Sequence, residues 1–346
     1  MQRQTDEAMQ FDDVSTLSID LDNAWSYLKT RGSAGWEDFP SYFDIVVPRV
    51  LDLLDRHGLR ITWFIVGQDA VLAKNRPALK SIAASGHEVG NHSFHHEPWM
   101  VFRSETELTD ELLRAHQAIV DATGLQPRGY RAPGYGLSSA MLEAAAHCQY
   151  DYDASTLPTF IGPLARAYYF MTTKLPSEER AQRSALFGRV SDGFRPLRPY
   201  RWKLNERTLL ELPVTTMPIF RTPFHVSYLI YLASFSIAAA RRYFRMALAL
   251  CRRRGVAPSL LLHPLDFLGG DDVQGFDFFP GMGLAAHEKV AFVDWCVGQL
   301  AGAFAVSPIG QFADTVAAAR PELPVHTFTD AGPNKYADRN SRDRHD

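Results

Sequence analysis

The stretch GNHSFHHEPW places three histidines, His92, His95 and His96, within five residues. His92 and His96 are four residues apart, so on a helical turn both imidazole rings would project from one face, a common way to build a metal site. Histidines that only form hydrogen bonds in a loop after a strand would give the same local pattern. The choice between the two depends on whether further ligands occur elsewhere in the chain.

Two aspartates and a third histidine supply such candidates. The segment SIDLDNAW ends an apolar run with Asp20 and Asp22, which are two residues apart and therefore project from the same side of a strand. The segment SLLLHPLD places His263 directly after another apolar run. A single aspartate at such a position often only caps a turn. Together, however, these residues indicate a site at the carboxyl ends of parallel strands, where βα barrels carry their chemistry.

The combination of ligand types points to hydrolysis. Two neutral imidazoles and one carboxylate leave a position open on Zn²⁺ for water, which is the arrangement of catalytic zinc sites. The same nitrogen and oxygen ligands also suit Co²⁺, Ni²⁺ or Fe²⁺. We therefore expect one divalent transition metal as cofactor, with zinc as the first choice. A second carboxylate outside the ligand set could then act as a base.

Apolar, β-branched runs alternate along the chain with segments of helical period, which predicts an α/β fold with a parallel sheet or barrel. Glycines follow several of the helical segments, where left-handed C-caps are expected. The expected strands are residues 17–21, 61–66, 88–91, 129–132, 150–153, 209–214, 259–263 and 304–308, and the expected helices are residues 41–56, 69–84, 104–122 and 138–147.

The domain organisation expected from this pattern is a single domain over residues 1–323. Residues 156–208 are too long for an ordinary βα loop and form an insertion. Residues 226–254 carry an uncharged run followed by an arginine-rich run and could form one long helix. The polar tail, residues 324–346, is expected to be loosely ordered.

Four motifs of the chain resemble those of one family, the polysaccharide deacetylases (NodB-homology, carbohydrate esterase family 4). The resemblance covers about residues 15–310, and its most specific element is the H-[ST]-x-x-H pattern. It implies a distorted (β/α)7-type barrel, which here would carry the long insertion. The motifs are Asp20-Leu21-Asp22, His92-Ser93-Phe94-His95-His96, Arg131-Ala132-Pro133-Gly134-Tyr135 and Leu261-Leu262-His263.

The resemblance also implies a role for each acid of the first motif. Most members of the family have two adjacent aspartates, whereas Leu21 intervenes here, as in a subgroup with a D-x-D pattern. In that subgroup the first acid is the base and the second is a ligand. Asp20 is therefore expected to be the general base, and the expected metal ligands are Asp22, His92 and His96.

The remaining motifs of the family would supply the rest of the catalytic machinery. Arg131 would hold the carboxylate of Asp20, for which a planar guanidinium is well suited. The turn that follows would offer a backbone N–H to the developing oxyanion, with Gly134 or Tyr135 as the donor.

The last motif would supply the general acid. His263 would have this role, and Leu261 would form a wall of the acetyl pocket. An aspartate usually orients the acidic histidine in this family, and Asp151 or Asp153 is available here, although the tryptophan expected beside it is missing.

The expected function is removal of an N-acyl group, above all acetyl, from an amino sugar of a polysaccharide or of a lipid-linked glycan precursor. A small-molecule amidohydrolase of the allantoinase type is an alternative with the same fold. The order FRPLRP and LELPVT also resembles, more faintly, the deformylases of lipid-linked aminoarabinose, which implies a polyprenyl-phosphate-linked amino sugar as substrate. The alternative without catalytic activity is a glycan-binding pseudoenzyme.

Charge and hydropathy limit the partners and the location. A net charge of -3 does not favour a nucleic-acid binder. The acidic N-terminal segment lacks the apolar core of a signal peptide, so the expected location is cytoplasmic. Aromatic, arginine and lysine residues in 160–203 and 226–254 are suited to peripheral contact with the inner membrane surface. An equal alternative for residues 226–254 is a barrel helix with a solvated arginine face.

Overall fold

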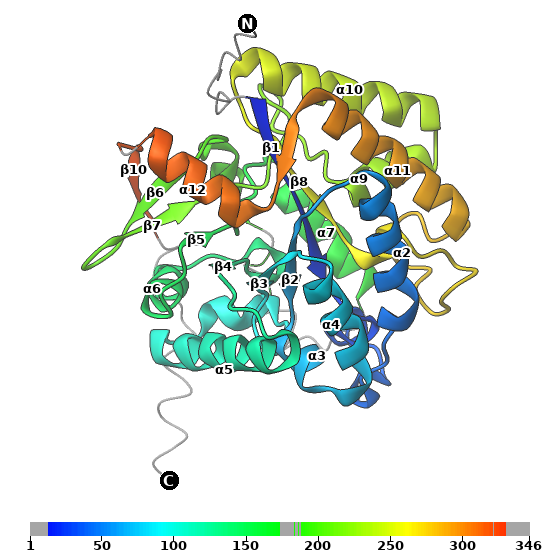
Figure 1. Ribbon diagram of the computed structural model, residues 1–346, viewed down its shortest axis with the longest axis horizontal. Helices are drawn as coiled ribbons and strands as arrows, with labels where there is room; N and C mark the ends of the chain where they lie inside the picture. Colours follow the sequence, from blue (N-terminus) through cyan, green and yellow to red (C-terminus); the bar gives the residue numbers. More distant parts are fainter. Residues whose placement is uncertain (1–12, 174–182, 184–185, 187, 321, 330–346) are drawn as a thin grey trace, which may run out of the picture.

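The computed structural model describes residues 13–173, 183, 186, 188–320 and 322–329. A mostly parallel sheet lies at its centre, with helices packed around it (Figure 1). The first strand, β1 (Val14–Leu21), is buried along its whole length and has three neighbours in the sheet, β2, β8 and β9. Its apolar residues Leu17, Ile19 and Leu21 alternate with the polar residues Ser18 and Asp20, and the neighbouring elements bury both sets.

The sheet follows the order β10-β6-β7-β5-β4-β3-β2-β1-β8, with β9 paired to the start of β1. All pairs are parallel except β6 with β7. The remaining strands are β2 (Thr62–Ile65), β3 (Glu88–Asn91), β4 (Gly129–Tyr130), β5 (Tyr152–Asp153), β6 (Tyr200–Lys203), β7 (Thr208–Glu211), β8 (Ser259–Leu262), β9 (Ala305–Ser307) and β10 (Val325–Thr327).

An irregular segment after β7 closes the parallel part of the sheet. The backbone N–H of Leu212 donates to the carbonyl of Asp153 over 2.9 Å. Three residues further on, the N–H of Thr215 donates to the carbonyl of Ser259 over 3.1 Å. The segment therefore bridges β5 and β8 without itself being a strand. Strands β8, β1, β2, β3, β4, β5 and β7 form a distorted (β/α)7-type barrel, which confirms the expected fold class.

Each of the expected strands overlaps a strand of the structure, and the helices begin and end close to where the sequence places them. Helix α5, for example, starts at a capping box between Ser104 and Glu107 and ends at Gly124, whose φ of 77° closes the helix. The helices are α1 (Ala24–Arg31), α2 (Phe43–Arg56), α3 (Gly67–Val71), α4 (Arg76–Ala84), α5 (Glu105–Thr123), α6 (Ser139–His147), α7 (Gly162–Thr172), α9 (Val226–Ala233), α10 (Ile237–Arg254), α11 (Ala286–Ala303) and α12 (Ile309–Ala319).

Two expected helices are each divided. Residues 69–84 form α3 and α4 instead of one helix, and Pro77 lies in the first turn of α4, where its missing N–H costs nothing. The expectation of one long helix over residues 226–254 is also wrong. Ser236 caps α10 by accepting a hydrogen bond from the N–H of Ala239, so a new helix begins there after α9 has ended.

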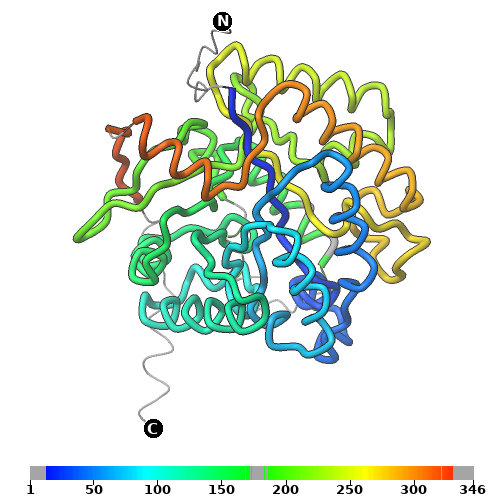
Figure 2. Tube along the Cα trace, in the orientation of Figure 1, coloured from blue at the N-terminus to red at the C-terminus, as the bar shows by residue number. Residues whose placement is uncertain are grey.

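Helix α10 packs as a barrel helix. Its buried side chains, among them Phe244 and Leu248, belong to the main core, and α10 lies beside α11 (Figure 2). Arg241 and Arg245 of its outer face lie over the ring of Trp295 on α11. Within the described residues, no helix combines the length and the hydropathy required to cross a bilayer.

The insertion and the tail add strands that the sequence analysis did not predict. β6 lies within the expected insertion, residues 156–208, and forms a hairpin with β7, while β10 pairs with β6 at the outer edge (Figure 2). The expectation of a loosely ordered tail from residue 324 is therefore wrong for Val325–Thr327. The rest of that tail, residues 330–346, and residues 174–182 of the insertion lie outside the described residues.

The alternation along β1 separates the core from the site. Leu17, Ile19 and Leu21 belong to the main hydrophobic core, whereas Ser18 and Asp20 do not and face the inside of the barrel. The same alternation in β8 leaves Leu261 outside this core cluster, on the side of His263. Strand alternation alone thus directs these polar side chains to the inside of the barrel.

Candidate active site

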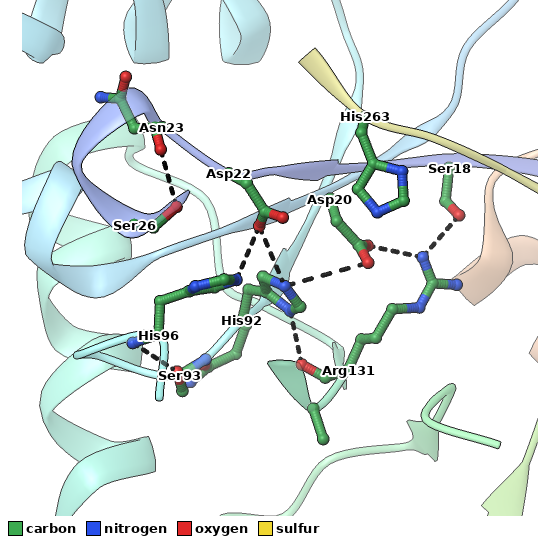
Figure 3. Close-up of polar contacts among 12 residues, drawn as sticks. Ser18, Asp20, Asp22, Asn23, Ser26, His92, Ser93, His96, Arg131 and His263 are labelled. Carbon is green, nitrogen blue, oxygen red and sulfur yellow. Dashed lines mark hydrogen bonds and ion pairs between the residues drawn. The ribbon is translucent and has the colours of Figure 1, made fainter. Parts of the chain in front are cut away.

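Asp22, His92 and His96 converge at the carboxyl ends of β1 and β3 (Figure 3). One donor atom from each lies within 4.8 Å of the others, and all three side chains are buried. The Oδ1 of Asp22 is 2.9 Å from Nε2 of His96 and 3.3 Å from Nε2 of His92. These are the three ligands expected from the sequence.

The loop that carries the histidines is not helical, which corrects the expectation of a helical turn. His92 directly follows β3, and His96 has a left-handed backbone with φ of 49°. Ser93 is also left-handed, with φ of 63°, and its hydroxyl accepts a hydrogen bond from the N–H of His96 over 3.1 Å. Residues other than glycine occupy this region at a cost and persist where surrounding contacts determine the backbone, often at functional sites.

Glu111 on α5 helps to hold the backbone of this loop. Its Oε1 accepts hydrogen bonds from the N–H groups of Phe94 over 3.1 Å and of His95 over 2.7 Å. The other oxygen lies 2.7 Å from Nδ1 of His95. The middle histidine therefore binds the glutamate that holds the loop, and it is not one of the clustered metal-binding side chains.

The electrostatics of the cluster favour a cation. Burial raises the pKa of Asp22, but the two histidines outweigh burial and hold that pKa well below its usual value. Burial likewise lowers the pKa of His92, but Asp20 and Asp22 outweigh it and raise the pKa overall. The two carboxylates thus stabilise positive charge at the imidazoles, and a divalent metal would take the same place.

The donor set fits a metal in its details. The Oδ1 of Asp22 is buried and has no hydrogen-bond partner among the described residues, although two imidazole nitrogens face it. Nδ1 of His92 lies 2.7 Å from the carbonyl oxygen of Arg131, so a proton on Nδ1 would leave the lone pair of Nε2 for a ligand. Asp22, His92 and His96 are therefore the residues that would hold the ion.

Asp20 is held by Arg131, as the resemblance implies. The Nη1 of this fully buried arginine donates to Oδ1 of Asp20 over 2.7 Å and to the hydroxyl of Ser18 over 2.8 Å. Its Nε donates to the carbonyl of Ala154 over 3.0 Å, and the guanidinium lies 4.2 Å from the ring centroid of Phe64. Asp20 lies beside the ligand cluster, with Oδ2 at 3.9 Å from Nε2 of His92.

The turn after Arg131 has the strained backbone of a functional loop. Gly134 and Tyr135 are both left-handed, with φ of 61° and 58°. The N–H of Tyr135 donates to the carbonyl of Ala132 over 3.1 Å. Of the two expected oxyanion donors, Tyr135 is therefore engaged within the turn, and Gly134 does not make this hydrogen bond. Leu261 is fully buried on β8, paired with Ser18 of β1.

His263 follows β8 and lies next to Asp20 in the site (Figure 3). Its Nδ1 is 3.0 Å from the hydroxyl of Ser227, and its backbone N–H donates to Asp266 over 2.8 Å. Sequence analysis did not select Ser227, and it left Asp266 without a role. Asp266 had a local signal, three residues after the histidine, whereas Ser227 is 36 residues away and had none.

The two aspartates considered as partners of His263 lie elsewhere. Asp151 is exposed and pairs with Arg128 over 2.8 Å. Asp153 is buried and accepts a hydrogen bond from Ser155 over 2.5 Å, next to Glu211. Burial and the neighbouring Asp153 raise the pKa of Glu211 well above its usual value. Neither aspartate orients His263.

A cavity of about 1270 Å³ is lined in part by the turn after Arg131, although the three metal-binding side chains, Asp20 and His263 are not among its lining residues. Gly134, Tyr135 and His225 line its catalytic end. Its other walls come mainly from the insertion and the C-terminal segment and include the aromatic residues Tyr200, Trp202 and Phe328. The insertion therefore shapes the space next to the catalytic residues.

Comparison with known proteins agrees with this geometry. The family model of polysaccharide deacetylases matches residues 35–152, which include His92, His96 and Arg131. A peptidoglycan deacetylase of Helicobacter pylori is 32% identical over 146 residues, which are 40% of this chain and 48% of that protein. A chitooligosaccharide deacetylase of Bradyrhizobium is 38% identical over 104 residues, 30% of this chain and 44% of that protein. The chain thus spans less than half the length of these relatives.

Solved structures share the whole fold. A polysaccharide deacetylase structure from Mycobacterium smegmatis has a TM-score of 0.58 at 21% identity and covers 92% of this chain and 95% of its own. The PuuE allantoinase has a TM-score of 0.55 at 13% identity, with 89% and 91% covered. At these identities the likeness concerns the barrel alone. The family model over residues 35–152, the deacetylase relatives and the shared barrel thus all show likeness to polysaccharide deacetylases.

Proposed function

We propose that this protein is a metal-dependent hydrolase that removes an N-acyl group, in the first place acetyl, from an amino sugar. The observation that carries the proposal is the convergence of Asp22, His92 and His96 within 4.8 Å, beside an aspartate held by a buried arginine. The relatives whose names specify a substrate are deacetylases of peptidoglycan and chitooligosaccharide, which contain amino sugars.

Each catalytic residue has one task in the reaction. A divalent metal bound by Asp22, His92 and His96 would polarise the acyl oxygen and lower the pKa of a water molecule toward about 7. Asp20 takes a proton from the attacking water molecule as the water oxygen bonds to the acyl carbon. His263 gives a proton to the nitrogen as the C–N bond breaks. The products are a carboxylic acid and a free amine.

The backbone and Arg131 support these steps without exchanging protons. Arg131 keeps Asp20 charged and oriented through the 2.7 Å hydrogen bond. The N–H of Gly134, which the turn hydrogen bond of Tyr135 leaves unused, would stabilise the negative charge that develops on the acyl oxygen. An amide nitrogen is a poor leaving group, so proton transfer from His263 is needed for the second half of the reaction.

The cavity favours a substrate larger than a single sugar. Small-molecule sites usually enclose about 300–1,000 Å³, and the cavity here is about 1270 Å³. This size argues against an allantoinase-like substrate and for a glycan or a lipid-linked amino sugar. Aromatic side chains such as Trp202 and Phe328 offer surfaces for sugar rings or for an apolar appendage.

Exposed apolar side chains near the cavity support contact with a membrane surface. Phe194 lines the cavity and is 76% exposed, and Leu164, on the helix that forms part of the wall, is 70% exposed. Phe220 is also exposed. The carbonyl of the next residue, Arg221, accepts a hydrogen bond from the hydroxyl of Thr159 in the cavity wall. Apolar patches of this kind mark interaction sites. We therefore propose a lipid-linked amino sugar as substrate, approached from the cytoplasmic side of the inner membrane.

Metal content and acyl release test the proposed function. The purified protein is reconstituted with zinc and incubated with peptidoglycan fragments, chitooligosaccharides, allantoin, and a polyprenyl-phosphate-linked amino sugar in N-acetyl and N-formyl forms. We expect one bound metal and release of acetate from an amino sugar. Release of formate alone would identify a deformylase. Binding of glycan with no acyl release from the metal-loaded protein would overturn the proposal in favour of a pseudoenzyme.

Vesicle sedimentation tests the membrane contact separately. Vesicles of phosphatidylglycerol are expected to bind the wild type and to bind Phe194→Ser and Phe220→Ser more weakly. Leu113→Ser is the matched control, because Leu113 is 50% exposed on α5, away from the cavity walls. Equal binding by all variants, or no binding by the wild type, would remove the membrane from the proposal.

A further inference from the structure

We infer that the hydroxyl of Ser227 is a positioning group for His263, and that it passes the influence of Asp266 to the imidazole ring. The inference rests on the proposed function, because it assigns His263 the role of proton donor to the leaving nitrogen. It adds a residue outside all four sequence motifs and shows which groups hold the ring of His263 in this chain.

The contact geometry joins the hydroxyl of Ser227 to the ring of His263, with Asp266 nearby. Oγ of Ser227 is 3.0 Å from Nδ1 of His263. Burial raises the pKa of Asp266, while the ring of His263 and the hydroxyl of Ser227 oppose that rise, so both groups lie close to the carboxyl. Among the described residues, this hydroxyl and no carboxylate contacts the ring nitrogen.

The three groups are held by separate elements that are each fixed. Ser227 lies in the first turn of α9, whose Val226, Leu229 and Ile230 are buried. Asp266 ends the short turn after His263. The buried Nζ of Lys289 on α11 holds that turn by donating to two carbonyl oxygens, those of Leu265 over 2.9 Å and Leu268 over 2.8 Å.

A hydroxyl in this position can serve both protonation states of the ring. Toward a neutral ring whose proton is on Nε2, Ser227 donates its hydrogen to Nδ1. Toward the imidazolium, Ser227 accepts from Nδ1–H and turns its own hydrogen to the carboxylate of Asp266. In both states Nε2 carries a proton directed away from Ser227.

The other histidine nearby does not compete for this proton. The ring of His225 has its centroid 6.3 Å from that of His263. Burial and the neighbouring His263 lower the pKa of His225 to about 3. His225 is therefore neutral at working pH, and His263 is the ring of the pair that delivers the proton.

Ser227→Ala tests the inference through the leaving group. The zinc-loaded variant and the wild type are compared on an N-acetyl amino sugar, whose amine must be protonated to leave, and on 4-nitrophenyl acetate, whose phenolate leaves without a proton. We expect kcat on the amide to fall roughly 10- to 100-fold, with little change in KM or in kcat on the ester. Ser227→Thr, which keeps a hydroxyl, should restore most of the amide activity.

Matched measurements separate this role from a structural one. Ser234→Ala removes a hydroxyl at the other end of α9, where Ser234 donates only to the carbonyl of Tyr231, and it should leave both activities unchanged. An equal fall on amide and ester in Ser227→Ala, or no recovery in Ser227→Thr, would overturn the inference. A wild type that binds metal but hydrolyses neither substrate would instead refute the proposed function.

Discussion

The site has a metal side, formed by Asp22, His92 and His96, and an acid side, formed around His263. The two sides are built in different ways. The proposed ligands Asp22, His92 and His96 directly follow β1 and β3, which are separated in the sheet by β2, and hydrogen bonds from Ser93 and Glu111 hold the histidine loop. His263 follows β8, and its ring nitrogen contacts a serine on a helix 36 residues away. The metal side thus uses residues that the sequence motifs contain, whereas the acid side also depends on a helix residue outside those motifs.

This difference indicates where variation could occur within such a barrel. A metal ion requires several donors within a few ångströms, so its ligands and their loop form one unit that changes little without loss of the ion. A proton donor needs only a ring held in the right orientation, and different neighbours could provide this. The wall of the cavity, which comes largely from the insertion, belongs to the variable side.

Replacement of a ligand should have the largest effect. His92→Ala is expected to abolish metal binding and to reduce acyl release to the uncatalysed level, as measured by elemental analysis and by acetate release. His95→Gln is the control from the same loop, because His95 binds Glu111. It should keep the metal and lose only about 1–3 kcal/mol of stability. Loss of metal in His95→Gln would show that the loop, and not the ligand atoms, determines binding.

Replacement of the base separates chemistry from metal binding on the same side. Asp20→Asn should keep one equivalent of metal and lose roughly 10²- to 10⁴-fold in kcat. The amide oxygen can still accept the hydrogen bond from Arg131, so the fold should be retained. If the variant also loses its metal, Asp20 is a ligand, and the division of roles between Asp20 and Asp22 is wrong.

Replacement of Asp69 should have the smallest effect, which concerns the free energy of unfolding and its dependence on pH. Its Oδ1 accepts hydrogen bonds from Asn23 over 2.7 Å, Trp25 over 3.0 Å and Asn75 over 2.9 Å, which fixes the chain just after Asp22. Burial raises its pKa to about 7. An acid whose pKa is raised on folding stabilises the protein fully below its unfolded pKa of about 4, and this contribution is lost as pH rises to about 7.

The variant Asp69→Asn should therefore flatten the pH dependence of the free energy of unfolding between about pH 4 and 7. The largest change this shift allows is about 4 kcal/mol. Urea unfolding at several pH values measures the effect, and metal content should stay unchanged. An unaltered slope would show that Asp69 is ionised in the folded protein, with the donors of Asn23, Trp25 and Asn75 compensating its burial.

The sequence predicted much of the architecture because local pattern determines it. The core face and the polar face of β1 follow from its alternation of apolar and polar residues, and the end of α5 follows from Gly124. The division of residues 226–254 was missed because the apolar pattern continues across the break, while the serine cap is a weak signal. β10 was missed because a three-residue strand in a polar tail depends on its partner β6.

The sequence by itself determined the residue types of the site, their places at strand ends and the family they resemble. Strand period directs Asp20 and Asp22 to one side whatever the rest of the chain does. Only the tertiary structure decided that the histidine loop is not helical, that His95 binds Glu111, and that Ser227 instead of Asp151 or Asp153 contacts His263. The physical reason is range: alternation and capping act over a few residues, whereas these contacts form only when packing brings distant segments within hydrogen-bond distance.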